Sequence, residues 1–212
     1  MDLLRSGLDK EEILKQTSMV VGVSDVNFSI KQGEIFVVMG LSGSGKSTLV
    51  RLLNRLIEPT QGQILFDEID ITLMSDKELT AFRRKEVNMV FQSFALMPHM
   101  NVIENVAFGL ELAGMTLEER QLCAARALEQ VGLATFSKKY PDELSGGMKQ
   151  RVMIAMSIAC KPSLLIADEP TTALDVTIQA QILDLLDELR KETQMSILLI
   201  THNLGIVAQY AD

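Results

Sequence analysis

The glycine-rich segment GLSGSGKS at residues 40–47 carries the clearest chemistry in this sequence. Glycines at this spacing let backbone N–H groups turn toward phosphate oxygens, and the start of the next helix adds a positive dipole end. We expect the segment to bind ATP, with Lys46 at the β- and γ-phosphates and the Ser47 hydroxyl on Mg²⁺. The residues that we expect to line the phosphates are Gly40, Ser42, Gly43, Ser44, Gly45, Lys46, Ser47 and Thr48.

Two adjacent carboxylates, Asp168 and Glu169, end an apolar run at residues 164–167. At the end of a strand, Asp168 would hold Mg²⁺ directly or through water, and Glu169 would polarise the attacking water. Taken alone, this pattern fits a plain surface turn equally well. The glycine-rich loop upstream is what gives the catalytic interpretation its weight.

Gln92 and His202 each follow an apolar run, at 87–91 and 197–200. The Gln92 amide could coordinate Mg²⁺ or orient water, and His202 would lie at the strand end that faces the ligand in a doubly wound sheet. The alternative for each residue is an ordinary polar group with local hydrogen bonds.

A second glycine-containing turn, LSGGMKQR at residues 144–151, stands before a helical pattern. The Ser145 hydroxyl and the N–H groups after it, including that of Gly147, could bind another phosphate group. Ser145 could also be a simple helix N-cap, and the two roles are compatible. Two phosphate-binding helix starts in one chain could serve one nucleotide across a dimer interface.

Hydrophobic periodicity places these residues in an α/β fold. Residues 35–56 read as strand, glycine loop and helix, which is the context that the loop motif requires and which disfavours a fortuitous glycine turn. Residues 93–159 read as a helical insert between strands of the core. The predicted strands are 20–30, 35–39, 63–66, 69–71, 87–91, 164–167 and 197–200, and the predicted helices are 9–16, 46–56, 76–84, 102–112, 117–131, 146–159 and 177–191.

Composition argues against several classes of function. The chain has 212 residues, with 20 Lys and Arg against 28 Asp and Glu, and its net charge of −8 disfavours nucleic-acid binding. The sequence has no run of about 18 apolar residues that would span a membrane, so a membrane role would require a partner. Cys123 and Cys160 lack metal-ligand spacing, and we expect buried free thiols in a reducing compartment.

Taken in order, these motifs resemble the nucleotide-binding subunit of ATP-binding cassette transporters over nearly the whole chain. The segment at 40–47 is similar to the Walker A motif, Gln92 to the Q-loop and His202 to the H-loop. Residues 144–150 are similar to the family signature, 164–169 to Walker B, and Ala173-Leu174-Asp175 to the D-loop. The resemblance implies a P-loop NTPase core with a parallel or mixed sheet, an antiparallel β part and a helical subdomain.

The same resemblance implies a division of labour. Residues 1–92 and 160–212 would form the core, residues 93–159 the helical subdomain, and ATP and Mg²⁺ would be the cofactors. Two cassettes would bind two ATP molecules head to tail, so that Ser145 and Gly147 of one contact the γ-phosphate held by Lys46 of the other. Glu169 would be the general base and His202 would stabilise the transition state. The metal site would use Ser47, Gln92 and Asp168, and Asp175 of the D-loop would join the nucleotide site.

The partners implied are a second ATPase subunit, a transmembrane permease at the cytoplasmic face of the membrane and, indirectly, a substrate-binding protein. Residues 35–114 resemble glycine betaine/proline importer cassettes, whereas 150–186 and 198–212 resemble oligopeptide or dipeptide importer cassettes. The region 92–111 faces the permease in this family, so we expect a compatible-solute importer, with the peptide importer as the alternative.

Three departures from the family pattern stand out. No aromatic residue precedes Phe28 to stack on adenine, so Met19 or Val20 would pack there. Asn203 follows His202 where Asp is usual, which would loosen contact with the partner subunit. The chain ends at Asp212, before a further strand pair, so we expect a truncated C-terminal end.

Other classes of function fit less well. A soluble cassette protein of DNA repair or translation would carry coiled-coil insertions, tandem cassettes or basic surfaces. A P-loop kinase would need neither the signature nor the D-loop. A regulator that binds ATP without turnover would not need both Glu169 and His202.

Overall fold

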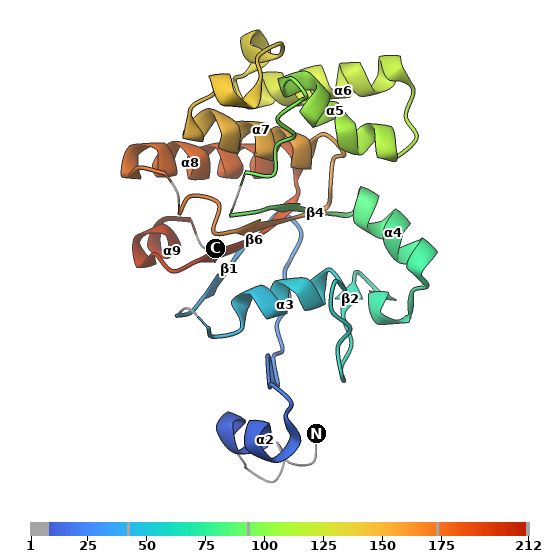
Figure 1. Ribbon diagram of the computed structural model, residues 1–212, viewed down its shortest axis with the longest axis vertical. Helices are drawn as coiled ribbons and strands as arrows, with labels where there is room; N and C mark the ends of the chain where they lie inside the picture. Colours follow the sequence, from blue (N-terminus) through green and yellow to red (C-terminus); the bar gives the residue numbers. More distant parts are fainter. Residues whose placement is uncertain (1–8, 42, 93, 173, 211–212) are drawn as a thin grey trace.

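A parallel four-stranded sheet forms the centre of this computed structural model, which describes residues 9–41, 43–92, 94–172 and 174–210 (Figure 1). Because every neighbouring pair is parallel, the carboxyl ends of the strands lie along one edge of the sheet. Met39 pairs with Thr201 and Asp168 pairs with Ile200, so the last residues of three strands emerge together. The order within the described residues is β1 (Ile35–Met39), β6 (Ser196–Thr201), β5 (Leu164–Asp168) and β4 (Val87–Val90).

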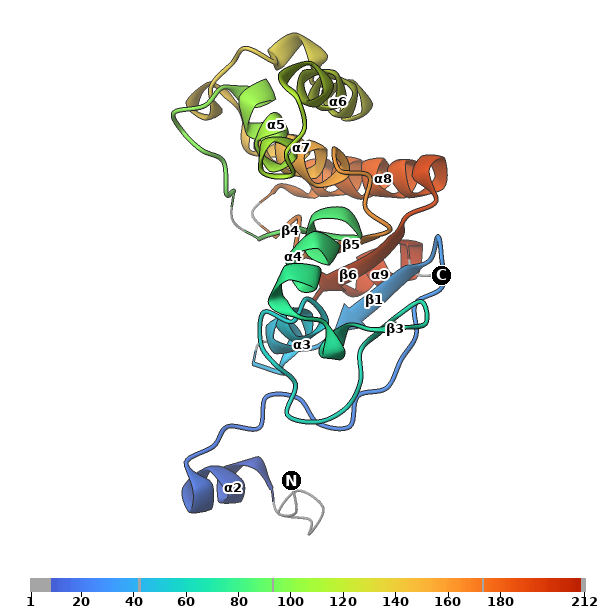
Figure 2. The same ribbon diagram turned by 90° about the vertical axis from the view of Figure 1, so that its right-hand side faces the viewer.

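Successive side chains of the strands enter two different cores, one on each face of the sheet. Leu165 packs in the cluster that includes Val152 and Ile182, whereas Ile166 packs in the cluster that includes Val50 and Phe82. A strand covered on both faces must be apolar throughout, which explains the uninterrupted runs seen in the sequence. The first core lies under α7 (Gly146–Ile158) and α8 (Val176–Thr193), and the second under α3 (Lys46–Leu53) and α4 (Asp76–Lys85), as Figure 2 shows.

Two more helices, α5 (Val102–Leu112) and α6 (Leu117–Gln130), form an outer layer against α7 (Figure 1). Capping boxes start both of them, with Asn101 and Glu104 at α5 and Thr116 and Glu119 at α6. The core on this face runs without a break from the sheet through α7 into α5 and α6. The boundaries of the core and the helical subdomain therefore stay a prediction, because the two share one apolar interior.

The small antiparallel part of the fold is a two-stranded ribbon, β2 (Leu65–Phe66) with β3 (Ile69–Asp70). Of the helices in the described residues, none is long and apolar enough to cross a membrane. The remaining elements are α2 (Lys10–Thr17), η1 (Ile71–Leu73), η2 (Ala134–Phe136), η3 (Pro141–Glu143) and α9 (Leu204–Tyr210).

The strand predicted at residues 20–30 does not form. The segment runs between α2 and β1 with Val20 79% exposed and Val26 48% exposed (Figures 1 and 2). A strand needs a hydrogen-bonded neighbour, and no described segment pairs with this one. Phe28 nevertheless stacks on Phe36 of β1, with ring centroids 4.9 Å apart, which ties the end of the segment to the sheet.

Candidate nucleotide site

The carboxyl edge of the sheet brings most of the predicted site residues together. The glycine-rich loop follows β1, Asp168 is the last residue of β5, and His202 comes directly after β6. Gln92 follows β4 by two residues and is exposed. Their roles remain predictions, but the strand order gives these residues one common edge.

The loop at 40–48 has the backbone that its glycines predict. Gly43 and Gly45 have φ angles of 80° and 98°, in the left-handed region that side chains rarely adopt. A Cβ atom at Gly45 would also lie 2.6 Å from the carbonyl oxygen of Gly22. Both constraints explain why glycine stands at the N-cap of α3. Ser42 lies outside the described residues.

The Lys46 side chain folds back over this loop. Its Nζ donates to the carbonyl oxygens of Gly40, at 2.5 Å, and of Leu41, at 3.0 Å. A cation at the centre of a loop whose N–H groups precede a helix is suited to phosphate oxygens. Ser47 and Thr48 begin that helix; Ser47 is exposed, and Thr48 is half-buried next to Gly22.

Asp168 lies in a setting that favours a bound cation. Burial raises the pKa of the Asp168 carboxyl, and the negative charge of Glu169 raises it further, whereas Lys46 and Arg51 lower it. No described residue donates a hydrogen bond to this carboxylate. A divalent ion would offset both unfavourable effects and fill the free acceptor positions. The donor set of Asp168, Ser47 and Gln92 is all oxygen, which suits Mg²⁺.

Glu169 is held from several sides. Its Oε2 accepts a hydrogen bond from the Thr172 hydroxyl at 3.0 Å, and its Oε1 lies 3.4 Å from Nδ1 of His202. Its backbone N–H donates to the carbonyl oxygen of Ile200 at 3.0 Å, and its φ angle of 47° is unusual for a residue with a side chain. Strain of this kind is kept where the surroundings fix a residue, as these contacts do for Glu169.

Thr172 was missed by the sequence analysis. It stands three residues after Glu169, which is the spacing at which a hydroxyl can reach back to a preceding carboxylate. That spacing was the available signal. The Glu169–His202 contact had no such signal, because the two residues are far apart in the sequence and meet only through the pairing of β5 with β6.

The second glycine turn, residues 144–148 (the signature turn), starts α7 on the opposite face of the sheet from α3. The Ser145 hydroxyl accepts a hydrogen bond from the N–H of Met148 at 3.3 Å, so its capping role is confirmed. Asp175 caps α8 in the same way, through the N–H of Ile178 at 3.0 Å. Ala173, also predicted in the D-loop, lies outside the described residues.

Both residues that were predicted to pack on the adenine base are exposed. Met19 is 69% exposed and Val20 is 79% exposed. The chain then passes close to α3, because a Cβ atom at Gly22 would lie 2.9 Å from Cγ2 of Thr48. This part of the chain therefore lies next to the helix that follows the glycine-rich loop. Contact of Met19 or Val20 with the base stays a prediction.

Asn203 has a clear local role. Its Oδ1 accepts a hydrogen bond from the N–H of Gly205 at 2.9 Å, and its own N–H donates to the Thr201 hydroxyl at 3.1 Å. These bonds fix the turn that carries His202 from β6 into α9. An aspartate would accept the same bond, so the Asn–Asp difference leaves this turn in place.

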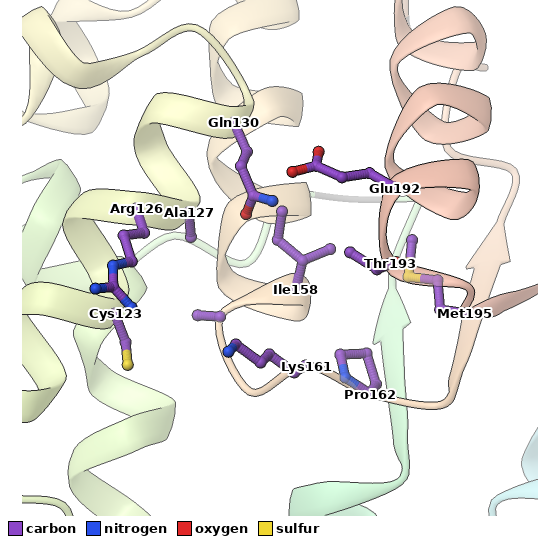
Figure 3. Close-up of a pocket in the computed structure, with 11 residues that line it drawn as sticks. Cys123, Arg126, Ala127, Gln130, Ile158, Lys161, Pro162, Glu192, Thr193 and Met195 are labelled. Atoms are coloured by element: carbon purple, nitrogen blue, oxygen red, sulfur yellow. The ribbon is translucent and has the colours of Figure 1, made fainter.

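A separate cavity of about 340 Å³ lies at the other edge of the sheet (Figure 3). It is formed where α6, α7 and α8 end and where the chain enters β5 and β6. None of the predicted nucleotide-site residues lines it. Its labelled residues are Cys123, Arg126, Ala127, Gln130, Ile158, Lys161, Pro162, Glu192, Thr193 and Met195.

Comparison with known proteins gives a consistent result. The family model described as ABC transporter matches residues 23–172, and a model of an AAA domain matches residues 139–208. A solved dimeric, post-hydrolysis structure of the ATP-binding cassette MJ0796 bound to ADP and Pi is similar, with a TM-score of 0.77 and 38% identity. That similarity covers 87% of this chain and 82% of the other.

Curated relatives match over both halves of the chain. The glycine betaine/proline betaine transport system ATP-binding protein ProV of Escherichia coli K12 is 54% identical over 99% of this chain. The glycine betaine/carnitine transport ATP-binding protein GbuA of Listeria monocytogenes is 49% identical over 99%. The chain spans about half the length of these relatives, 52% and 53% respectively. On this evidence from motif order, fold and sequence identity, the chain belongs to the ABC transporter family.

Proposed function

We propose that this chain binds and hydrolyses ATP to drive import of a betaine-type compatible solute. The observation that carries the proposal is the shared strand edge, where Lys46, Asp168, Glu169 and His202 converge. The relatives named for glycine betaine transport support the choice of substrate, because they align with 99% of the chain at 54% and 49% identity.

Each residue has a defined task in this scheme. Lys46 gives up its bonds to the loop carbonyls and binds the β- and γ-phosphate oxygens. Asp168, Ser47 and Gln92 would hold Mg²⁺, which would supply positive charge next to the transferred phosphoryl group. Glu169, fixed by Thr172, takes the proton of the attacking water. His202, beside Glu169, donates to the γ-phosphate oxygens in the transition state.

The working site would need two copies of the cassette. The glycine-rich loop starts a helix on one face of the sheet, and the signature turn starts a helix on the other. The signature turn of a second chain, with its Ser145 hydroxyl and Gly147 N–H, would complete the phosphate site. Asp175 would approach the same nucleotide from that second chain. The dimeric form of the similar cassette structure supports this arrangement.

The membrane partner follows from the family. A permease would receive the energy of hydrolysis through Gln92 and the helices at 102–130, with the cassette at the cytoplasmic face of the membrane. A substrate-binding protein would deliver the solute on the other side. The peptide-like stretches in the C-terminal half favoured the alternative of oligopeptide import, but the betaine-transport relatives match that half as well.

The substitution Glu169→Gln tests the catalytic assignment. Without the carboxylate, steady-state ATP hydrolysis by the purified chain should fall by about 100-fold or more, because general-base catalysis contributes at least that factor. Binding of a fluorescent ATP analogue should be unchanged, and ATP should now promote a stable dimer on gel filtration. Unchanged hydrolysis would remove Glu169 from the mechanism.

The substrate assignment needs the chain with its permease in lipid vesicles. Glycine betaine, presented with the binding protein, should stimulate hydrolysis, whereas a dipeptide or oligopeptide should not. Stimulation by peptide alone would favour the alternative importer class.

A further inference from the structure

The signature turn is packed tightly against the start of α8. A Cβ atom at Gly147 would lie only 2.7 Å from Cγ2 of Ile178, closer than real Cβ contacts occur. A Cβ atom at Gly146 would lie 3.4 Å from Cδ2 of Leu174, on the D-loop, and 4.0 Å from Phe94. Because both residues are glycines, the side chains of Leu174 and Ile178 can pack directly on the backbone at the start of α7.

The other side of this contact is itself fixed. Asp175 accepts a hydrogen bond from the backbone N–H of Ile178 at 3.0 Å, so the residue that touches Gly147 is tied to the D-loop aspartate. The Gln179 amide donates to the carbonyl oxygen of Leu174 at 2.9 Å and closes the same turn. Ile178 and Leu174 also pack on the main apolar core. The start of α8 is thus a rigid support.

We propose that Ile178 is a positioning residue that locks the signature turn to the D-loop, so that both reach the second chain's nucleotide as one unit. This inference rests on the proposed two-chain site. It gives Gly147 a second task besides phosphate binding, since any side chain there would push α7 away from α8. A shift of about 1 Å in a phosphate-binding group can lower a reaction rate 100-fold. The contact between Ile178 and Gly147 should therefore affect the rate of ATP hydrolysis.

Two variants of Ile178 distinguish its contact with Gly147 from a general loss of side-chain volume. Ile178→Val keeps Cγ2, the atom that meets Gly147, and loses only Cδ1, so hydrolysis should stay within about twofold of the parent chain. Ile178→Ala removes Cγ2, and the rate constant for hydrolysis should fall about tenfold. ATP affinity of the isolated monomer should not change, because the monomer's own glycine loop lies on the opposite face of the sheet.

A mixed pair of chains makes the test specific. One chain, the loop chain, carries Ser145→Arg and lends only its glycine loop. The other, the turn chain, carries Lys46→Ala and lends only its signature turn. Each mixed dimer of the two chains holds one intact composite site, formed by the glycine loop of the loop chain and the signature turn of the turn chain. Ile178→Ala can then be placed on either chain.

The expected result is asymmetric. Ile178→Ala on the turn chain should lower the hydrolysis of the mixture about tenfold, and the same change on the loop chain should leave it within about twofold. Equal loss from both chains would mean that Ile178 matters only for general packing, and no loss from either would remove its role, so both outcomes overturn the inference. If the mixture without Ile178→Ala is inactive, the two-chain site itself is wrong and the inference falls with it.

Discussion

Glu169 illustrates how much of the site depends on contacts between distant residues. The sequence predicts a carboxylate at a strand end, and the structure adds the Thr172 hydroxyl at 3.0 Å, His202 at 3.4 Å and a left-handed backbone. These features fix the direction of the carboxylate, which a motif cannot specify. The orientation of the general base is therefore a property of three segments together.

Removal of the Thr172 hydroxyl should show this at the scale of one residue. Thr172→Val keeps the shape of the side chain but loses a hydrogen bond to a charged group, which contributes about 1.5–3 kcal/mol. We expect the rate constant for hydrolysis to fall about tenfold or more, with ATP affinity unchanged. Thr80→Val is the matched control, since its hydroxyl donates to the carbonyl oxygen of Asp76 within α4. An equal effect of both changes would contradict the role of Thr172.

Among the elements, α7 buries a polar side chain whose amide nitrogen is not hydrogen-bonded within the described residues. Gln150 is 1% exposed, and its Nε2 has no hydrogen-bond partner among the described residues. The Gln150→Met change keeps the volume and removes this orphan donor, which costs about 1–3 kcal/mol when buried. The free energy of unfolding should therefore rise by about 1 kcal/mol, measured as a shift of the denaturant midpoint at constant slope.

The control variant should change the free energy of unfolding in the opposite direction. Gln179, on α8, donates its side-chain N–H to the carbonyl oxygen of Leu174 at 2.9 Å, so Gln179→Met removes a satisfied bond and should lower the stability by about 1 kcal/mol. If Gln150→Met destabilised the chain as much as Gln179→Met, the Gln150 side chain would have to be hydrogen-bonded in solution.

The elements also show where sequence patterns suffice. Helices α5 and α6 were predicted to within one residue, because periodicity and capping residues are local signals. The predicted strand at 20–30 failed because alternation says nothing about whether a partner strand is available. The close approach of Gly147 to Ile178 was not foreseen either, since it joins two helices that are far apart in the sequence.

At the scale of the whole molecule, the two faces of the sheet divide the chemistry. The glycine-rich loop, Asp168 and Glu169 lie at the start of α3 and the end of β5, whereas the signature turn begins α7 on the other face. The order of motifs along the chain predicts both the glycine-rich loop and the signature turn. From the sequence, the dimer is an inference that rests on the presence of two phosphate-binding helix starts. The fold adds the physical reason, because one chain does not bring α3 and α7 to the same face.

Complementation between two inactive chains tests this central claim most directly. The loop chain (Ser145→Arg) and the turn chain (Lys46→Ala) should each hydrolyse ATP poorly alone, because every site in either homodimer lacks one half. Mixed in equal amounts at constant total concentration, they should regain up to about a quarter of the parent rate, since random pairing makes half of the dimers mixed and each mixed dimer holds one intact composite site. A mixture no more active than the two separate chains would contradict the account, since it would place both halves of the site in one chain.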